Sequence, residues 1–194
     1  MPSRDDARLG AALRELLRRG YGMLPEDLPR NVRELGIEHL GARDVVLYLV
    51  DLDQTELRPF DPERPDLASE PIDASAAGRA FQEERLVVQT GDDGRRIWIP
   101  VLDSAERLGV LAVHDDGEVH PRTWGHYTSL IGELVMGKQQ FGDAIAVRRR
   151  TGELTVAAEM RWSLLPPLTF TSPKVGISGI LQPSRIIAGD AFDY

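Results

Sequence analysis

Two aspartates near the C-terminal end and four histidines are the residues of this sequence best suited to chemistry. Asp190 and Asp193 lie three positions apart, and such carboxylates either bind hard divalent cations or cap a turn. An imidazole can act as a ligand, but exposed or merely hydrogen-bonded histidines are far more common. Cysteine is absent, which excludes disulfides, thiolate metal sites, cysteine nucleophiles and thioether-linked chromophores. The histidines are His39, His114, His120 and His126.

The composition is that of a soluble globular protein. Of the 194 residues, 42% are hydrophobic and 28% are charged, and the formal net charge is -8. This negative charge argues against nucleic acid as the partner, because phosphate contacts require an excess of Lys and Arg. No stretch approaches the roughly 20 apolar residues of a membrane span. The N-terminal residues carry acids and lack a long apolar run, so we expect no secretory signal, no membrane partner and a cytoplasmic location.

The N-terminal part is expected to form two helices. Leucines recur at helical spacing between positions 9 and 17, and Ser3 followed by Asp6 matches a capping box. A second helix is predicted from Leu28 to Leu40, with Gly41 as its stop signal.

The pattern then changes to that of strands joined by short turns. Runs of β-branched and aromatic residues predict strands at 44–51, 55–60, 85–90, 95–102 and 108–115. Residues 61–71, rich in Pro and acids, predict an exposed loop, and Asp73 or Ser75 is expected to cap a short helix through Phe81. An amphipathic helix is predicted after Pro121. The order of elements predicts an α+β fold with a largely antiparallel sheet and helices on one face.

Residues 5–140 resemble the core of GAF domains. The resemblance implies a GAF-like antiparallel sheet with helices packed on it, placed at residues 1–142. It also implies a possible small-molecule ligand between sheet and helices, or a role as a dimer scaffold without ligand. Gly109, among bulky strand residues, predicts a close backbone approach or a bulge, and Pro100 predicts a sheet edge or strand end. The matching residues are Gly78, Ala80, Phe81, Ile99, Pro100, Val101, Leu108, Gly109, Val110 and Leu111.

Several ligand classes of GAF domains find no support in the sequence. The absence of cysteine removes the usual bilin attachment and the chemistry of the free-methionine-sulfoxide reductases, and the cyclic-nucleotide signature is missing. A haem-binding version would require one of the four histidines. The large aromatics are expected in the core, with Trp98 lining a ligand cavity as the alternative. These aromatics are Tyr48, Phe81, Trp98 and Trp124.

Residues 143–168 are expected to form a linker helix. Leu154, Ala158, Arg161 and Leu165 follow a helical stripe, while the arginine run 148–150 interrupts the apolar pattern. One interpretation of this run is a solvated charged face with a soft point in the helix. The other is a signalling helix that dimerises and transmits movement. The prolines at 166 and 167 end the helix.

The segment from the linker to the last residue resembles the opening of bacterial PPM-type serine/threonine phosphatases of the sporulation stage-II protein E class. A Ser-Leu-Leu-Pro motif is followed at the expected distance by a Gly-Asp-x-x-Asp-Tyr motif, with Ala188 standing where the family usually has glycine. The resemblance implies that residues 169–194 are the truncated first strands of such a domain. The matching residues are Ser163, Leu164, Leu165, Pro166, Pro183, Ser184, Gly189, Asp190, Phe192, Asp193 and Tyr194.

The same resemblance implies a pair of Mn²⁺ or Mg²⁺ ions that activate water against a phosphoserine or phosphothreonine. Asp190 is then the first candidate metal ligand and Asp193 the second. The family needs further aspartates downstream of these motifs, so we expect the 194 residues by themselves to bind no metal pair, to contribute no complete catalytic set and to be inactive.

Together these patterns predict the regulatory GAF sensor or dimerisation region of a bacterial metal-dependent phosphatase. Its expected partners are a second copy of the chain and a phosphorylated regulatory protein as substrate. The alternative is a non-catalytic GAF module that binds a protein or a small ligand and is coupled to another output domain.

Overall fold

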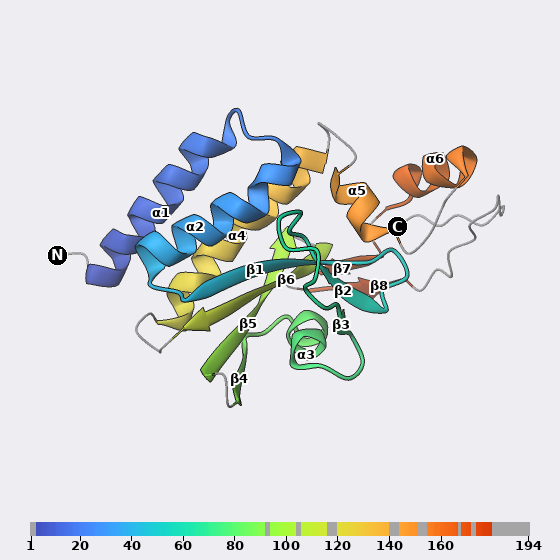
Figure 1. The fold of residues 1–194 in the computed structure, drawn as a ribbon. Coiled ribbons are helices and arrows are strands. Elements are labelled where there is room, and N and C mark those ends of the chain that lie inside the picture. Colours follow the sequence, from blue (N-terminus) through green and yellow to red (C-terminus); the bar gives the residue numbers. More distant parts are fainter. Residues whose placement is uncertain are drawn as a thin grey trace.

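A computed structural model describes residues 3–91, 94–103, 106–115, 120–139, 144–150, 155–166, 168–171 and 174–179. The central feature is a six-stranded antiparallel sheet with the order β3-β2-β1-β6-β5-β4 (Figure 1). The five predicted strands are confirmed, with small shifts at their ends. The strands are β1 (Asp44–Val50), β2 (Glu56–Pro59), β3 (Glu70–Pro71), β4 (Val87–Gly91), β5 (Gly94–Asp103) and β6 (Glu106–Asp115).

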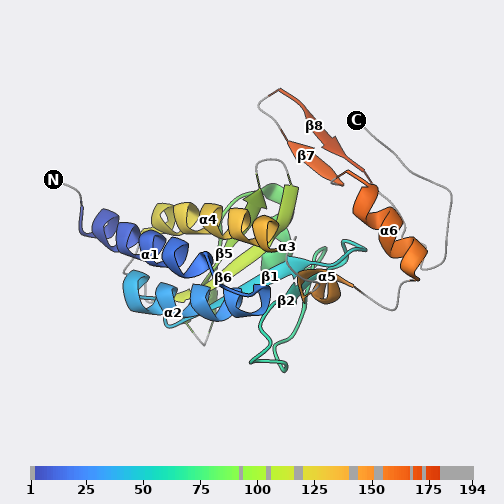
Figure 2. The same ribbon diagram turned by 90° about the horizontal axis from the view of Figure 1, so that it is seen from above.

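Helices cover both faces of this sheet. Three long helices lie together on one face, as Figure 2 shows, and a short helix, α3, packs on the other. The expectation that all helices share one face is therefore wrong for α3, because the sheet is apolar on both faces and each must be covered. The helices of this domain are α1 (Arg4–Gly20), the 3₁₀ helix η1 (Pro25–Asp27), α2 (Leu28–Leu40), α3 (Ala76–Glu83) and α4 (Pro121–Gln139).

Local capping explains where these helices begin and end. The Asp6 N–H donates to Ser3 Oγ at 3.1 Å and the Ser3 N–H to Asp6 Oδ2 at 3.0 Å, which is the predicted capping box. Gly41 ends α2 in the left-handed conformation, with φ of 73°. The Gly78 N–H donates to Ser75 Oγ at 2.9 Å, so Ser75 rather than Asp73 caps α3.

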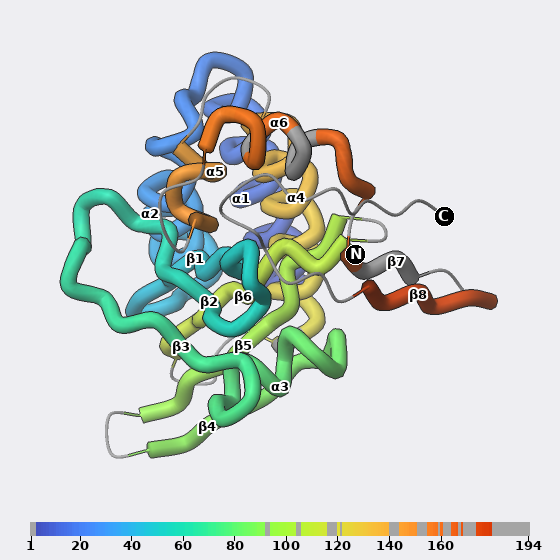
Figure 3. The backbone as a smooth tube through the Cα atoms, turned by 90° about the vertical axis from the view of Figure 1, so that its right-hand side faces the viewer, coloured from blue at the N-terminus to red at the C-terminus, as the bar shows by residue number. Residues whose placement is uncertain are grey.

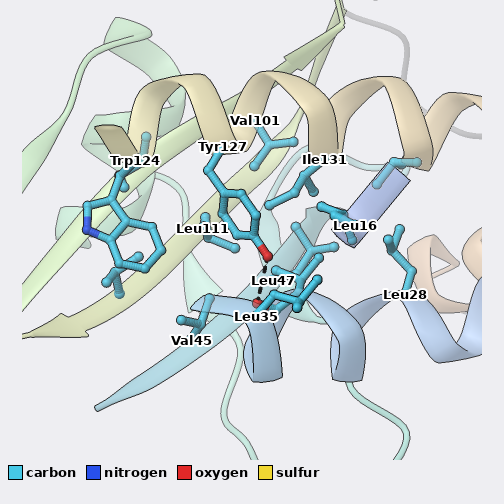
Figure 4. Packing of buried hydrophobic residues seen from close by; sticks show 14 of the residues in the cluster. Leu16, Leu28, Leu35, Val45, Leu47, Val101, Leu111, Trp124, Tyr127 and Ile131 are labelled. Atoms are coloured by element: carbon cyan, nitrogen blue, oxygen red, sulfur yellow. Dashed lines mark hydrogen bonds between the residues drawn. The ribbon is translucent and has the colours of Figure 1, made fainter. Parts of the chain in front are cut away.

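The larger hydrophobic core lies between the sheet and α1, α2 and α4 (Figure 4). The Tyr127 hydroxyl on α4 donates to the Val32 carbonyl on α2 at 3.0 Å, and burial raises the pKa of Tyr127 well above its usual range. The Trp124 and Tyr127 rings meet edge to face. Other buried members drawn in the figure are Leu16, Leu28, Leu35, Val45, Leu47, Val101, Leu111 and Ile131.

Gly109 and Pro100 show how closely β6 packs against its neighbours. A Cβ atom at Gly109 would lie 1.9 Å from the Tyr48 carbonyl oxygen on β1, which confirms the predicted close approach. Pro100 lies inside β5 rather than at its end. β4 pairs with β5 only as far as the Val87–Trp98 pair. Beyond that pair β5 is the edge strand of the sheet, and Pro100 lies in this part of β5.

The segment 61–71 is less exposed than its composition predicts. Asp61 is buried, and its Oδ2 accepts from Arg33 and from Arg64, each at 2.7 Å. Glu70 and Pro71 form the short strand β3. The expectation of exposure is therefore wrong at Asp61, whose carboxylate the arginines compensate, and that of a loop is wrong at residues 70 and 71, which pair with β2. Most of residues 62–69 are exposed, as predicted.

The C-terminal part contains two helices and a hairpin. The predicted linker region holds α5 (Ala144–Arg149) and α6 (Val156–Leu164), separated by a stretch that includes Arg150 and residues outside the described ranges. Strands β7 (Thr169–Thr171) and β8 (Gly176–Ser178) form a separate two-stranded sheet beside the main one (Figure 3). Asp190 and Asp193 lie outside the described residues. Among the helices described, none has the length and apolar character needed to cross a membrane.

Candidate functional site

A row of four polar residues crosses the α3 face of the sheet and is the first candidate site. Cross-strand pairing places Asp44 of β1 opposite His114 of β6, His114 opposite Arg96 of β5, and Arg96 opposite Gln89 of β4. Because side chains two positions apart share a face of a sheet, the next row on this face is apolar. That row consists of Val46, Ala112, Trp98 and Val87. We call Asp44, His114, Arg96 and Gln89 the polar row.

Hydrogen bonds and ring contacts hold the polar row in a fixed arrangement. Arg96 Nε donates to His114 Nε2, so the imidazole accepts at this nitrogen. The Arg96 guanidinium also lies over the Trp98 ring, 5.3 Å from its centroid. Trp98 Nε1 donates to Gln89 Oε1 at 3.1 Å. The row therefore holds a cation over a buried aromatic ring, which suits recognition of a polar molecule.

Asp44 at the β1 end of the row is neutralised by a neighbouring loop. Arg64 Nη1 donates to both carboxylate oxygens of Asp44, at 2.9 and 2.8 Å, and its Nε donates to Asp61. These charge-assisted bonds tie the loop 61–69 to the edge of the α3 face. In the part of the chain that the structure describes, Arg96 is thus the charged residue of the polar row that forms no ion pair with a carboxylate.

Two further groups near the row are shifted toward their protonated forms. Burial raises the pKa of Glu70, and the positive charge of Arg96 opposes part of this increase. Burial also raises the pKa of Tyr48, and the negative charge of Glu70 adds to the effect. The Tyr48 hydroxyl is a hydrogen-bond donor, so the α3 face has a donor besides Arg96.

The space between the sheet and α3 is filled largely by aromatic side chains. Tyr48, Trp98 and Phe81 are buried there, and the Tyr48 and Trp98 rings meet edge to face. Gly78 lets α3 approach closely, because a Cβ atom there would lie 1.8 Å from the Ile72 carbonyl oxygen. The prediction of a core role for Tyr48, Phe81, Trp98 and Trp124 is confirmed, since all four are buried. Trp98 contacts polar groups at the border of this core and is not among the residues that line the cavities described below.

The second candidate site is the arginine segment, residues 148–150 at the end of α5. Arg148 Nε donates to the Pro59 carbonyl at 2.5 Å, and Arg149 Nε donates to the Val50 carbonyl at 3.1 Å. The backbone contributes too, because the Leu52 N–H donates to the Arg149 carbonyl at 2.8 Å. The interpretation of this run as a solvated charged face is therefore wrong, because the side chains of Arg148 and Arg149 bind backbone carbonyls of β2 and β1.

Two more contacts strengthen this attachment. Arg58 Nη1 on β2 donates to the Arg150 carbonyl at 2.7 Å, and Arg149 Nη2 lies 3.5 Å from Glu106 Oε1 on β6. The arginine segment thus contacts three adjacent strands of the sheet. The sequence revealed an interruption of the helical pattern at this point, but nothing in it identified the carbonyl partners some ninety positions away.

The histidines do not converge on one ligand site in the described part of the chain. His120 and His126 line a cleft of about 270 Å³ between the N-terminal ends of α1 and α4, with Asp5 and Asp6. The Arg122 N–H donates to His120 Nδ1 at 3.1 Å. His39 lies on α2, 3.9 Å from Glu38, while His114 belongs to the polar row. Within the described ranges, no three His, Asp or Glu side chains cluster as a metal site would require.

A cavity of about 400 Å³ lies between α4 and the part of β5 beyond the end of β4. Its walls are mostly apolar, with Ile99 and Leu102 from β5, and its polar side includes Arg122 and Thr128. The Thr128 hydroxyl donates to the Gly125 carbonyl at 2.8 Å, so it offers the cavity only an acceptor. The cavity has the size of a small-ligand pocket but few convergent polar groups.

Comparison with known proteins identifies the fold. No protein-family model matches the chain, and no curated protein matches it. Among solved structures it is similar to the GAF domains of phosphoenolpyruvate-protein phosphotransferases from Coxiella burnetii (12% identity, TM-score 0.60) and Acinetobacter (13% identity, TM-score 0.58). Each of these two alignments covers 73% of this chain and 98% of the other.

A third similar structure is an enzyme with bound substrate. The free methionine-R-sulfoxide reductase from Neisseria meningitidis is 15% identical, with a TM-score of 0.56, over 73% of this chain and 96% of that one. These likenesses confirm the GAF-like fold that the sequence predicted.

Proposed function

We propose that this chain is a sensory or regulatory module, in which a GAF-like domain controls the segment that follows it. The observation that carries this proposal is the attachment of the arginine segment to the sheet. The side chains of this segment contact the carbonyl oxygens of Val50 and Pro59 and the carboxylate of Glu106, which belong to three different strands. A change in the position of these strands would therefore act on α5 directly, and through it on whatever the chain carries beyond.

The polar row is the proposed sensing surface. It combines a fixed cation, Arg96, with an aromatic ring, Trp98, and with the amide of Gln89. Both β1 and β6 belong to this row and also reach the arginine segment, at Val50 and Glu106 respectively. The same two strands thus connect the proposed sensing surface with the proposed output contact.

This proposal can be tested by NMR on the full chain with a library of small polar metabolites. The Trp98 indole N–H reports on the polar row, and the Leu52 amide reports on the arginine segment. A ligand that shifts the Trp98 signal and changes the exchange rate of the Leu52 amide supports coupled sensing. Ligands that shift Trp98 while leaving Leu52 unchanged would contradict the coupling.

The finer proposal is that the controlled output is a Mn²⁺- or Mg²⁺-dependent serine/threonine phosphatase acting on a phosphorylated regulatory protein in a bacterial cytoplasm. It is supported by the motif that contains Asp190 and Asp193, and it is compatible with the β7–β8 hairpin within residues 169–194. In a polypeptide that carries the remaining motifs of the class, Asp190→Asn should abolish metal-dependent hydrolysis of a phosphoprotein, whereas Asp193→Asn should lower it less. Undiminished hydrolysis by Asp190→Asn would refute the assignment.

A second candidate function is an interaction module that binds no small molecule. The filled core between the sheet and α3 favours it, because Tyr48, Phe81 and Trp98 occupy the space where a ligand would lie. Exposed apolar side chains offer a surface for a second copy: Leu17 and Tyr21, four positions apart at the end of α1, are 56% and 98% exposed. The absence of any ligand effect, together with a stable dimer, would favour this function.

A further inference from the structure

A small cavity lies between β2 and α5, next to the arginine segment. Its volume is about 240 Å³, and two arginines from different elements, Arg58 and Arg148, form part of its wall. Phe60, Pro62 and Val147 provide the apolar part of the wall. The cavity therefore combines positive charge with an apolar surface, between a strand of the sheet and the first helix of the linker region.

The two arginines have unused hydrogen-bonding capacity. Arg58 Nε is buried and has no hydrogen-bond partner among the described residues; Glu56 Oε2, 3.7 Å away, is too far for a hydrogen bond. Arg148 has its Nε bond to the Pro59 carbonyl, and no carboxylate of the described residues forms an ion pair with it. A buried donor without a partner is costly, which favours an acceptor at this site.

The electrostatic environment of Arg148 also favours an anion. Burial lowers the pKa of Arg148, and the positive charge of Arg58 lowers it further. Two like charges at a cavity wall repel each other, and an anion between them would offset this repulsion by attracting both.

One carboxylate lines the cavity but is already neutralised. Asp61 Oδ2 accepts from Arg33 and Arg64, each at 2.7 Å, and Asp61 Oδ1 accepts from the Glu63 N–H at 3.1 Å. Asp61 is therefore held by two other arginines, and among the described residues it forms no ion pair with Arg58 or Arg148. Glu56 Oε2 lies 3.7 Å from Arg58 Nε, and because the Glu56 side chain is 45% exposed, water screens this ion pair.

We propose that this cavity binds a small organic anion, whose carboxylate or phosphate group lies between Arg58 and Arg148 and whose apolar part contacts Phe60 and Val147. The cavity is smaller than the usual range for drug-sized ligands, which suits a metabolite of modest size. Planar guanidinium groups bind both carboxylate and phosphate oxygens well, so both classes fit the donors.

Such an anion would connect β2 to α5. Because Arg58 comes from the sheet and Arg148 from the linker, a bound anion adds a bridge to the existing contacts of the arginine segment. The Leu52 amide, which donates to the Arg149 carbonyl, should then exchange more slowly. Regulation of an output by the bound anion rests on the proposed function, whereas binding of the anion does not.

The binding test uses phenyl phosphate, benzoate and neutral benzamide as probes, with the full chain and isothermal titration calorimetry. We expect phenyl phosphate or benzoate to bind and benzamide not to bind, and the stronger of the two anions identifies the ligand class. Arg148→Gln should weaken binding at least about tenfold, because it removes a charge-assisted contact. Arg122→Gln, which changes an arginine at the α4 cavity, is the matched control and should bind as the wild type does.

A second variant covers the case in which Arg148→Gln disturbs folding. Val147 is 52% exposed, so Val147→Phe should be tolerated while its ring fills the mouth of the cavity and blocks the probe. Wild-type chain that binds neither anion at millimolar concentration would overturn the proposed site, as would binding unchanged in both variants. Hydrogen exchange at the Leu52 amide, measured without any probe, tests the attachment of α5 separately. Failure of the anion-binding site can therefore be distinguished from failure of the proposed function.

Discussion

Gly109 lies where β6 passes closest to β1, and the residue type is dictated by the space available. The Tyr48 carbonyl oxygen occupies the position that a side chain would need. Glu70 is a second residue governed by its surroundings, because burial disfavours its charged form. A single substitution at either residue should therefore change the measured stability of the protein.

Gly109→Ala should destabilise the protein by about 2 kcal/mol or more, because the new methyl group clashes with backbone that cannot move without breaking the β1–β6 ladder. Urea unfolding measures the change. Gly125→Ala in α4 is the control: no atom lies within 4 Å of its added Cβ, and alanine favours a helix by up to about 1 kcal/mol. Equal stability of the two variants would contradict the close packing at Gly109.

Glu70→Gln should change the pH dependence of stability in a defined direction. Since burial raises the pKa of Glu70 in the folded state, the folded protein holds its proton more tightly than the unfolded chain. Stability is therefore lost as the pH rises from the unfolded pKa through the folded one. The glutamine variant should escape this loss and gain on the wild type above that window, in unfolding curves from pH 3 to pH 8. A constant difference across the whole range would argue against a shifted Glu70.

At the scale of elements, α2 and α4 form one layer through both apolar packing and a specific hydrogen bond. Tyr127 reaches across from α4 to the carbonyl of Val32, at the centre of the buried cluster in Figure 4. This bond fixes the relative position of the two helices, which apolar contacts alone would leave freer.

Tyr127→Phe should cost about 1 kcal/mol, the usual net value of a buried hydrogen bond, since the ring and its packing are retained. Thermal and chemical unfolding both report this loss. Tyr21→Phe provides the comparison, because Tyr21 is 98% exposed and the variant should match the wild type. If the two substitutions had equal effects, the hydrogen bond to Val32 would contribute nothing to stability.

The sequence predicted those features that depend on neighbours along the chain. The capping box at Ser3, the stop at Gly41 and the five predicted strands follow from local patterns, and all are confirmed. The buried Asp61 and the attached arginine segment depend on distant partners: Arg33 is 28 positions from Asp61, and Arg148 is 89 positions from Pro59. A local pattern of charges indicates solvent exposure by default, and only the fold shows which charges become paired. The polar row likewise required the register of four strands.

At the scale of the whole molecule, a GAF-like domain is followed by a linker that is attached to its sheet. The strands that carry the polar row also hold the arginine segment, so the two candidate sites share β1 and β6. The exposed apolar residues at the end of α1 lie in the three-helix layer, on the opposite side of the sheet from α3 (Figure 1).

The surface at the end of α1 should hold two copies of the chain together. Leu17→Asp combined with Tyr21→Asp should shift a dimer to monomer in sedimentation velocity, because both exposed apolar side chains would become charged. Val88→Asp places the same charge on β4, where the wild-type side chain is 47% exposed, and should leave association unchanged. A wild-type chain that remains monomeric at every concentration tested would contradict this surface.

The account depends most on the attachment of the arginine segment, and hydrogen exchange at the Leu52 amide measures it directly. Arg149→Met keeps the apolar stem but removes the contacts to Val50 and Glu106, and Arg79→Met on the exposed side of α3 is its control. We expect Arg149→Met to speed Leu52 exchange by roughly tenfold, equivalent to about 1.4 kcal/mol, with Arg79→Met unchanged. Exchange at Leu52 that is equally slow in both variants would contradict the coupling of the sheet to the linker.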